Sequence, residues 1–286
     1  MRRNPTPGPM IPPMAHYVKS HGLGNDYIVI DPAKVPFAIT AEAVQLICDR
    51  HLGVGSDGIL LVQPPRGADF GVRIYNPDGS DAEKSGNGIR IFAKYLREHG
   101  YTTKDRFSID TAGGRVGVQL DVRGGRVIEV TADTGIVTFD PLESIDVDGR
   151  RLAVTSVSIG NPHCVVIVDD LTKIDPRALG RKIEIHRAFP AKTNVQFAEV
   201  LSRSHIAIEI WERGAGYTLA SGTSSCVVAA AAHRKGLVDR EVTVTMPGGE
   251  LEVTVGEDYA MRMRGPVEEV TVGDFSADLL AHLSSR

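Results

Sequence analysis

Short apolar runs rich in β-branched residues recur along the chain and predict a protein built mostly of strands. The runs are bounded by Gly, Pro, Asn and Asp, which favour turns. The clear runs cover residues 27–31, 58–62, 72–76, 116–122, 164–170, 206–212, 241–246 and 251–257. Only a few segments favour a helix instead, namely residues 41–50, 86–98, 223–234 and 276–283. The middle two are each followed by a glycine, Gly100 or Gly236, which commonly ends a helix. This balance predicts an α+β fold with mixed, mainly antiparallel sheet.

An internal repeat is the most informative feature of the sequence. Residues 76–100 align without a gap to residues 212–236. In each segment a strand ends on a polar residue, a glycine-bearing loop follows, and Ser-Gly stands nine residues later, at Ser85 or Ser221, before a helix. Gly-Gly hairpin signals follow in both halves. Two unrelated units could share this turn chemistry, but duplication is the better interpretation.

Duplication predicts two pseudo-symmetric lobes, each of sheet wrapped around one central helix. We expect an N-terminal lobe at residues 16–133, a C-terminal lobe at 134–265, and a return of residues 266–286 to the first lobe. Residues 1–15 hold several prolines and no apolar core of a signal peptide, so they are expected to form a loose extension. A pseudo-twofold axis would place the equivalent loops face to face across a cleft.

The two Ser-Gly pairs have a chemical use if they meet. Each stands where a helix begins, so free backbone N–H groups and the positive end of the helix dipole would point into the cleft. Such a place suits a carboxylate. Gly86 and Gly222 would let the backbone approach closely. Paired proton carriers beside a carboxylate-bearing carbon could remove a proton from one face and return one to the other.

Each of these polar residues also has a purely structural explanation. Ser85 and Ser221 could be simple helix caps. Asn25 and Asn76 could be turn residues, His163 a buried core histidine, and Glu212 with Arg213 a solvated pair. Only the repeat, and the clustering of polar residues at strand ends, favour a site.

Composition and net charge exclude several classes of binding partner. The net charge of −4 gives no basic footprint for nucleic acid or an anionic membrane, and no apolar run reaches eighteen residues. Cys48, Cys164 and Cys226 lie far apart without CxxC spacing, which argues against zinc and against a disulfide framework. We interpret all three as buried apolar residues of a cytoplasmic protein.

Several motifs together are highly specific. They are HGLGNDYIVID (21–31), RHLGVGSDGILLV (50–62), NPDGSDAEKSGNGIR (76–90), GNPHCVV (160–166), FPAKTNVQF (189–197) and WERGAGYTLASGT (211–223). Through them, from Lys19 to about residue 270, the chain resembles the diaminopimelate epimerase family. The resemblance implies two lobes around central helices, an active site between them, and conversion of LL- to meso-diaminopimelate in lysine biosynthesis. It also implies an amino-acid substrate without cofactor or metal. A homodimer is expected because strand-rich two-lobed enzymes of this size are often dimers.

In that family two cysteines, one per lobe, act as base and acid on opposite faces of the α-carbon. Ser85 and Ser221 stand at their positions here. The resemblance implies that His163 and Glu212 tune the acid–base pair. The residues implied to contact substrate are Asn25, Asn76, Asn161, Asn194 and Arg213, with Gly86, Asn87, Gly222 and Thr223 forming the cradle for the carboxylate. Tyr217 and Ser224 also depart from the family pattern, at positions that commonly hold Glu and Gly.

A serine hydroxyl is a far weaker acid than a thiol, so it needs a helper. Glu212 could assist Ser221, and Glu83, Asp81 or Lys84 could assist Ser85, giving a hydroxyl relay. A carboxylate could instead be the direct base, as in the related isomerase of phenazine biosynthesis. The protein could also act on another amino acid, bind an amino acid without catalysis, or carry serines introduced to trap a complex.

Overall fold

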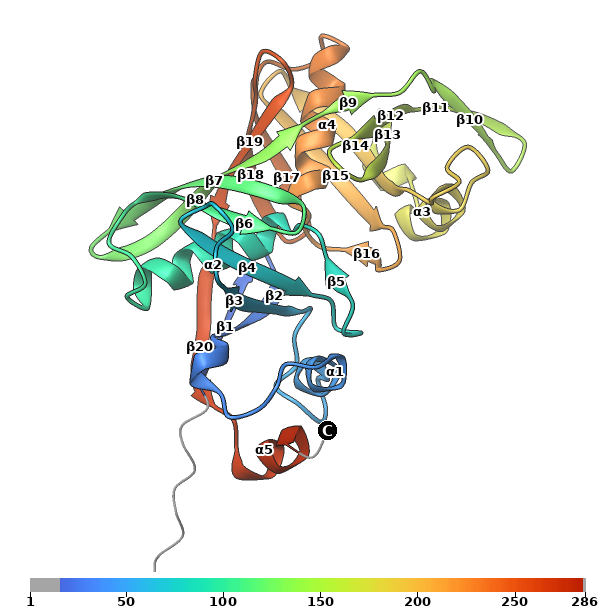
Figure 1. Cartoon of the computed structure of the whole chain (residues 1–286). Coiled ribbons are helices and arrows are strands. Elements are labelled where there is room, and N and C mark those ends of the chain that lie inside the picture. Colours follow the sequence, from blue (N-terminus) through green and yellow to red (C-terminus); the bar gives the residue numbers. More distant parts are fainter. Residues whose placement is uncertain (1–15, 285–286) are drawn as a thin grey trace, which may run out of the picture.

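Two copies of one strand-and-helix unit make up most of the chain (Figure 1). The computed structural model describes residues 16–284, so the predicted extension at residues 1–15 lies outside the described part. The first copy comprises β1 (His16–Gly22), β2 (Asn25–Ile30), α1 (Ala41–Cys48), β3 (Ile59–Gln63), β4 (Phe70–Tyr75), β5 (Asp81–Ala82), α2 (Gly86–Glu98), β6 (Arg106–Thr111), β7 (Gly114–Arg123) and β8 (Arg126–Ile136).

The second copy repeats this order element by element. It comprises β12 (Thr155–Ser158), β13 (Pro162–Val168), α3 (Pro176–Glu184), β14 (Asn194–Ser202), β15 (His205–Glu212), β16 (Gly216–Thr218), α4 (Gly222–Arg234), β17 (Glu241–Met246), β18 (Gly249–Val255) and β19 (Ala260–Pro266). The remaining elements are β9 (Thr138–Phe139), β10 (Ser144–Val147), β11 (Arg150–Ala153), β20 (Glu268–Asp274), α5 (Ala277–Ser284) and the 3-10 turns η1 (Pro32–Lys34) and η2 (Leu171–Lys173).

Strand pairing is also repeated. The parallel pairs β2–β3 and β4–β6 correspond to β13–β14 and β15–β17. The antiparallel hairpin β6–β7 corresponds to β17–β18, and each turns at the glycine-containing signal seen in the sequence. The other pairings of the large sheet are antiparallel, so the predicted class, α+β with mainly antiparallel strands, is confirmed.

The two copies exchange their last strands. β8 and β19 pair antiparallel with each other, and the chain then continues from β8 into β9, which pairs with β12. In the same way the chain after β19 enters β20, which pairs with β1. Residues 268–274 thus lie on the first copy. The division of the chain at residues 133 and 265 stays a prediction, because β8 and β19 span both halves.

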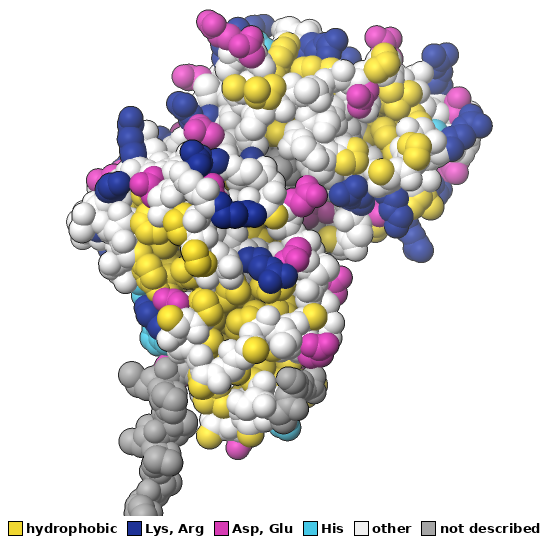
Figure 2. All heavy atoms as spheres, viewed as in Figure 1, with side chains coloured by type: hydrophobic (Ala, Val, Ile, Leu, Met, Phe, Trp, Pro, Cys, Tyr) yellow, Lys and Arg dark blue, Asp and Glu magenta, His cyan; other side chains and the backbone are white. Residues whose placement is uncertain are grey.

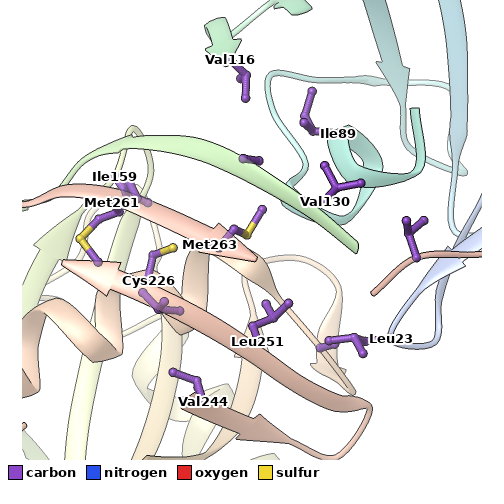
Figure 3. Close-up of a cluster of buried hydrophobic side chains, with 14 of the residues drawn as sticks. Leu23, Ile89, Val116, Val130, Ile159, Cys226, Val244, Leu251, Met261 and Met263 are labelled. Carbon is purple, nitrogen blue, oxygen red and sulfur yellow. The ribbon is translucent and has the colours of Figure 1, made fainter. Parts of the chain in front are cut away.

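One continuous core connects the two central helices. It includes buried residues of α2, such as Phe92, and of α4, such as Val228, together with β8 and β19. Figure 3 shows Met261 and Met263 of β19 in this core, with Cys226 of α4 on one side and Ile89 and Val130 on the other. Separate smaller cores lie under α1 with α5 and under α3. A shared core makes the relative placement of α2 and α4 part of the folding free energy.

The helices follow the sequence prediction with local differences. The helix predicted at residues 41–50 ends at Cys48, because the Asp49 carboxylate accepts from the backbone N–H groups of His51 and Leu52 and turns the chain. The helix α3, which is short and largely polar, was not predicted from the sequence. Its start signal was present, since Asp175 caps the helix and Pro176 is its first residue.

Figure 2 shows acidic and basic side chains interspersed over this face of the molecule. Within residues 16–284, none of the helices combines the length and the apolar character needed to cross a membrane.

The close packing of Met263 on Gly222 gives a test of the shared core. A Cβ on Gly222 would lie 2.6 Å from the Met263 sulfur, so G222A should destabilise the protein by about 1–3 kcal/mol through overpacking. M263A alone should cost about 2–5 kcal/mol because it leaves a cavity. The double variant G222A/M263A should lose at least about 1 kcal/mol less unfolding free energy than the sum of the two single losses, since truncating Met263 makes room for the methyl group added at position 222. Urea unfolding measures this, with G222A/M261A as the additive control; additivity in both pairs would contradict the packing.

Candidate active site

The N-termini of α2 and α4 touch each other. A Cβ placed on Gly86 would lie 3.3 Å from the Gly222 Cα and 2.7 Å from the Met263 Cε. A Cβ on Gly222 would lie 3.4 Å from the Gly86 Cα. Glycine at both positions permits this close approach, because a side chain at either would displace the end of Met263 and press on the other helix. The two Ser-Gly loops of the repeat are neighbours in space.

Ser85 caps α2. Its Oγ accepts a hydrogen bond from the Gly88 N–H at 3.0 Å and a second one from the hydroxyl of Tyr27 at 3.1 Å. Tyr27 comes from β2, and its side chain is 7% exposed. The oxygen of Ser85 is thus held by two donors.

Ser221 caps α4 and has a different set of partners. Its Oγ accepts a long bond, 3.5 Å, from the Ser224 N–H and lies 3.4 Å from the Thr223 hydroxyl. The carboxyl group of Glu212, at the end of β15, interacts with this hydroxyl. Burial raises the pKa of Glu212, and the interaction with Ser221 offsets part of that rise. Glu212 is therefore a stronger base, when ionised, than an exposed carboxylate.

Charges from both copies act on one another at this junction. Burial, together with the weaker effect of the negative charges on Glu212 and Asp57, raises the pKa of Tyr27 to about 12, and the hydrogen bond with Ser85 acts in the opposite direction. Asp57 likewise contributes to the raised pKa of Glu212. Tyr27 and Asp57 belong to the first copy and Glu212 to the second. The surroundings of the two serines thus share one electrostatic environment.

Asn87 joins the two loops. Its amide nitrogen donates to the Asn25 Oδ1 at 3.1 Å and, across the junction, to the Ala220 carbonyl at 3.4 Å. The Asn25 amide in turn donates to Asp57 at 2.9 Å. This chain ties the start of α2 to the residue before Ser221.

A buried cation lies directly behind Asn87. Arg90 is fully buried, and its guanidinium donates to the Asn87 Oδ1 at 3.0 Å and the Gly86 carbonyl at 3.4 Å. Its Nε has no partner, and no carboxylate in residues 16–284 pairs with it. Burial lowers the pKa of Arg90 to about 10, which leaves it charged at neutral pH. An unpaired cation and two helix N-termini together favour an anion at the junction.

His163 is connected to the start of α4 through Gln196. Burial lowers the pKa of His163 to about 3, so the ring is neutral at physiological pH. Its Nδ1 accepts from the Gln196 amide at 3.0 Å, which leaves the Nε2 proton for the Asn161 Oδ1, also at 3.0 Å. Gln196 also donates to the Ser224 hydroxyl at 2.9 Å. A neutral imidazole that makes two hydrogen bonds orients its neighbours and does not supply a charge.

Three residues predicted to contact the substrate make hydrogen bonds that do not involve the two serines or their partners. The Asn76 amide donates to Ser80 at 2.9 Å within the β4–β5 turn. The Asn194 amide donates to the Pro162 carbonyl, and its oxygen accepts from the Arg213 N–H, both at 3.0 Å. Arg213 is exposed, and its guanidinium donates to the Ala191 carbonyl. The structure shows these bonds, and the binding roles stay predictions.

The three residues suggested to assist Ser85 in proton transfer are bonded to other groups or exposed. Asp81 pairs with Arg73 at 2.7 Å, Lys84 donates to the Thr134 carbonyl at 2.6 Å, and Glu83 is exposed. Tyr27 holds Ser85 instead. Tyr27, Arg90 and Gln196 were not predicted from the sequence. A polar group inside an apolar strand or helix face was a usable signal, since buried polar groups need partners.

The cysteines lie apart from these bonds, as expected from the sequence. All three are free and buried, and burial raises the pKa of Cys226 to about 11 and of Cys164 to about 12. In residues 16–284, no three His, Cys, Asp or Glu side chains gather in a way that could hold a metal ion. Two surface hollows, one beside Glu250 and Arg264 and the other beside Arg97 and His99, contain none of the predicted site residues.

Curated relatives match the chain over nearly its full length. The family model described as diaminopimelate epimerase matches residues 17–139 and 155–270. Diaminopimelate epimerase 2 of Nostoc sp. is 44% identical, over 93% of this chain and 97% of its own. The diaminopimelate epimerase of Desulfitobacterium hafniense is 41% identical, over 92% and 99%.

More distant solved structures share the fold. A hydroxyproline epimerase from Agrobacterium vitis superposes with a TM-score of 0.71 at 16% identity, over 96% of this chain and 99% of its own. A probable proline racemase from Agrobacterium radiobacter gives 0.70 at 17%, over 92% and 93%. A phenazine biosynthesis protein from Bacillus anthracis gives 0.69 at 16%, over 92% and 99%. Full-length similarity to the curated relatives, on this duplicated fold, shows that the chain belongs to the diaminopimelate epimerase family.

Proposed function

We propose that this protein converts LL-diaminopimelate to meso-diaminopimelate by moving a proton at the α-carbon without a cofactor. The observation that carries the proposal is the 44% sequence identity, over almost the whole chain, to a curated diaminopimelate epimerase. The contact between the two Ser-Gly helix starts supports it, because the proposed reaction needs one proton carrier from each copy.

The reacting carboxylate would be bound where α2 and α4 meet. The backbone N–H groups of the first turns and the positive ends of both helices attract an anion there. Arg90 adds a full positive charge from within the core. When the α-proton leaves, negative charge moves onto the carboxylate oxygens, so these groups would stabilise the carbanion more than the bound substrate.

The serines would exchange protons with the two faces of the α-carbon. A serine hydroxyl is a poor base, and Glu212, with its raised pKa and its interaction with Ser221, would accept the Ser221 proton as Ser221 takes the α-proton. His163, held neutral by burial, would keep Asn161 and the Gln196–Ser224 pair in place.

A second candidate is an amino-acid-binding protein without catalysis. The residues that favour it are the two serines themselves, since the resemblance places them where the family has thiols. The anion-binding groups would serve binding equally well. We further propose a cytoplasmic location, supported by three free buried cysteines, and a homodimer, which sedimentation would test.

Solvent deuterium entering the α-carbon tests the proposed function. The protein should exchange the α-hydrogen of LL- and meso-diaminopimelate in D2O, followed by NMR, and leave other amino acids unchanged. S85A and S221A should each slow epimerisation by about 10²-fold or more, because each removes one proton carrier. S276A is the matched control, since the Ser276 hydroxyl also accepts from a helix N–H but stands at the start of α5.

Binding of diaminopimelate without exchange would contradict the epimerase and support the binding protein. Exchange that appears only in S85C/S221C would show that the substrate site is intact and that the acid–base pair alone is inadequate.

The raised pKa of Glu212 predicts how stability changes with pH. The folded protein holds this proton more tightly than the unfolded chain, whose carboxyl titrates near 4.5. The stability of the native protein, relative to E212Q, should therefore fall as pH rises from about 4.5 through the raised pKa. E212Q should match the native melting temperature in acid and exceed it at neutral pH, while losing exchange. The exposed-residue variant E241Q is the control; a difference that does not depend on pH would contradict the buried charge.

A further inference from the structure

Tyr27 is a buried hydroxyl at the junction that the proposed mechanism does not use. Residues of β2 alternate, with Ile28 and Ile30 in the small core under α1, and Tyr27 and Val29 in the shared core that contains α2. The Tyr27 hydroxyl reaches the Ser85 Oγ at 3.1 Å. Gly58 makes room for the ring, since a Cβ there would lie 2.8 Å from the Tyr27 Cε1. The strand thus holds the phenol against the serine.

The two serines differ in what surrounds their oxygens. The Ser85 Oγ accepts from the Gly88 N–H and from Tyr27, so both of its lone pairs are occupied. Its own proton must therefore point in a third direction. The Ser221 Oγ has long contacts with donors, at 3.5 Å from the Ser224 nitrogen and 3.4 Å from the Thr223 hydroxyl, so its lone pairs are held more loosely. The carboxyl group of Glu212 interacts with this hydroxyl, and an ionised carboxylate can only accept, so the Ser221 proton is directed to Glu212.

We propose that Tyr27 is a positioning residue that makes Ser85 the proton donor of the pair, so that protons are removed at Ser221 and delivered from Ser85. This inference rests on the proposed epimerase function. Tyr27 would thus give the two serines different roles in proton transfer, which the symmetry of the duplicated fold alone would not provide. Burial keeps the phenol protonated at neutral pH, because it raises the pKa of Tyr27 to about 12.

The proton count balances. The α C–H bond breaks, its proton goes to the Ser221 oxygen, and the Ser221 O–H proton passes to Glu212. On the other face, the Ser85 O–H proton forms the new C–H bond as the Tyr27 proton passes to the Ser85 oxygen. Tyr27 is left as phenolate and Glu212 as carboxylic acid. Water then returns a proton to Tyr27 and takes one from Glu212, so the cycle needs no other reactant.

A thiol titration tests the positioning without any substrate. In S85C the new thiol can be followed by its rate of alkylation with iodoacetamide against pH, since Cys48, Cys164 and Cys226 are buried and burial raises the pKa of each. A donated hydrogen bond favours the thiolate. Adding Y27F should therefore raise the pKa of that thiol by about one, a tenfold change.

The matched control is Y95F. Tyr95 is also buried, and its hydroxyl lies 3.0 Å from the Tyr101 hydroxyl at the far end of α2. Adding Y95F to S85C should leave the thiol pKa unchanged. No rise with Y27F, or an equal rise with Y95F, would overturn the proposal.

Catalysis by Y27F gives the second measurement. For the stereoisomer whose proton is removed at Ser221, the variant should still exchange deuterium with retention, while inversion from Ser85 slows. The ratio of exchange to inversion should rise at least about tenfold over the native protein and Y95F, whereas loss of structure would lower both rates together. A parallel fall, or no change, would overturn the proposal. If the native protein exchanges neither isomer, the proposed function fails, and the thiol titration still decides whether Tyr27 positions residue 85.

Discussion

The contact between the starts of α2 and α4 is the constraint on which the rest of the structure depends. The backbones at Gly86 and Gly222 approach so closely that a methyl group at either position would collide with Met263 or with the other helix. Two like-signed helix ends repel, and Arg90 adds a buried positive charge that no carboxylate pairs with in the described part of the chain. This arrangement costs free energy, so the protein must gain its stability elsewhere.

That stability comes from the exchange of strands. β8 and β19 pair with each other and extend as β9 and β20 onto the opposite copies. The core they form holds residues of both helices, so the helix starts cannot separate without exposing apolar surface. Asn87 adds a polar link, bonding to Asn25 in its own copy and to Ala220 in the other. Hydrophobic burial thus offsets the electrostatic cost of the site.

Duplication supplies a symmetric frame, and individual side chains make it asymmetric. Both serines cap their helices in the same way. Ser85 faces a phenol from β2, whereas Ser221 faces a carboxylate from β15. A phenol and a carboxylate differ widely in acidity, and burial raises the pKa of both. Environments that separate two titratable groups in this manner are typical of sites that transfer protons.

The sequence alone determined the local elements and the repeat. Ser85 and Gly100 set the predicted limits of α2, and the Gly-Gly hairpin signals are the turns of β6–β7 and β17–β18. These depend on caps and turn chemistry within a few residues. Only the tertiary structure decided which groups serve the serines. Asp81 and Lys84, near Ser85 in sequence, bond elsewhere, while Tyr27 reaches it from 58 residues away. Strand pairing sets such distances, because it joins residues that no local pattern connects.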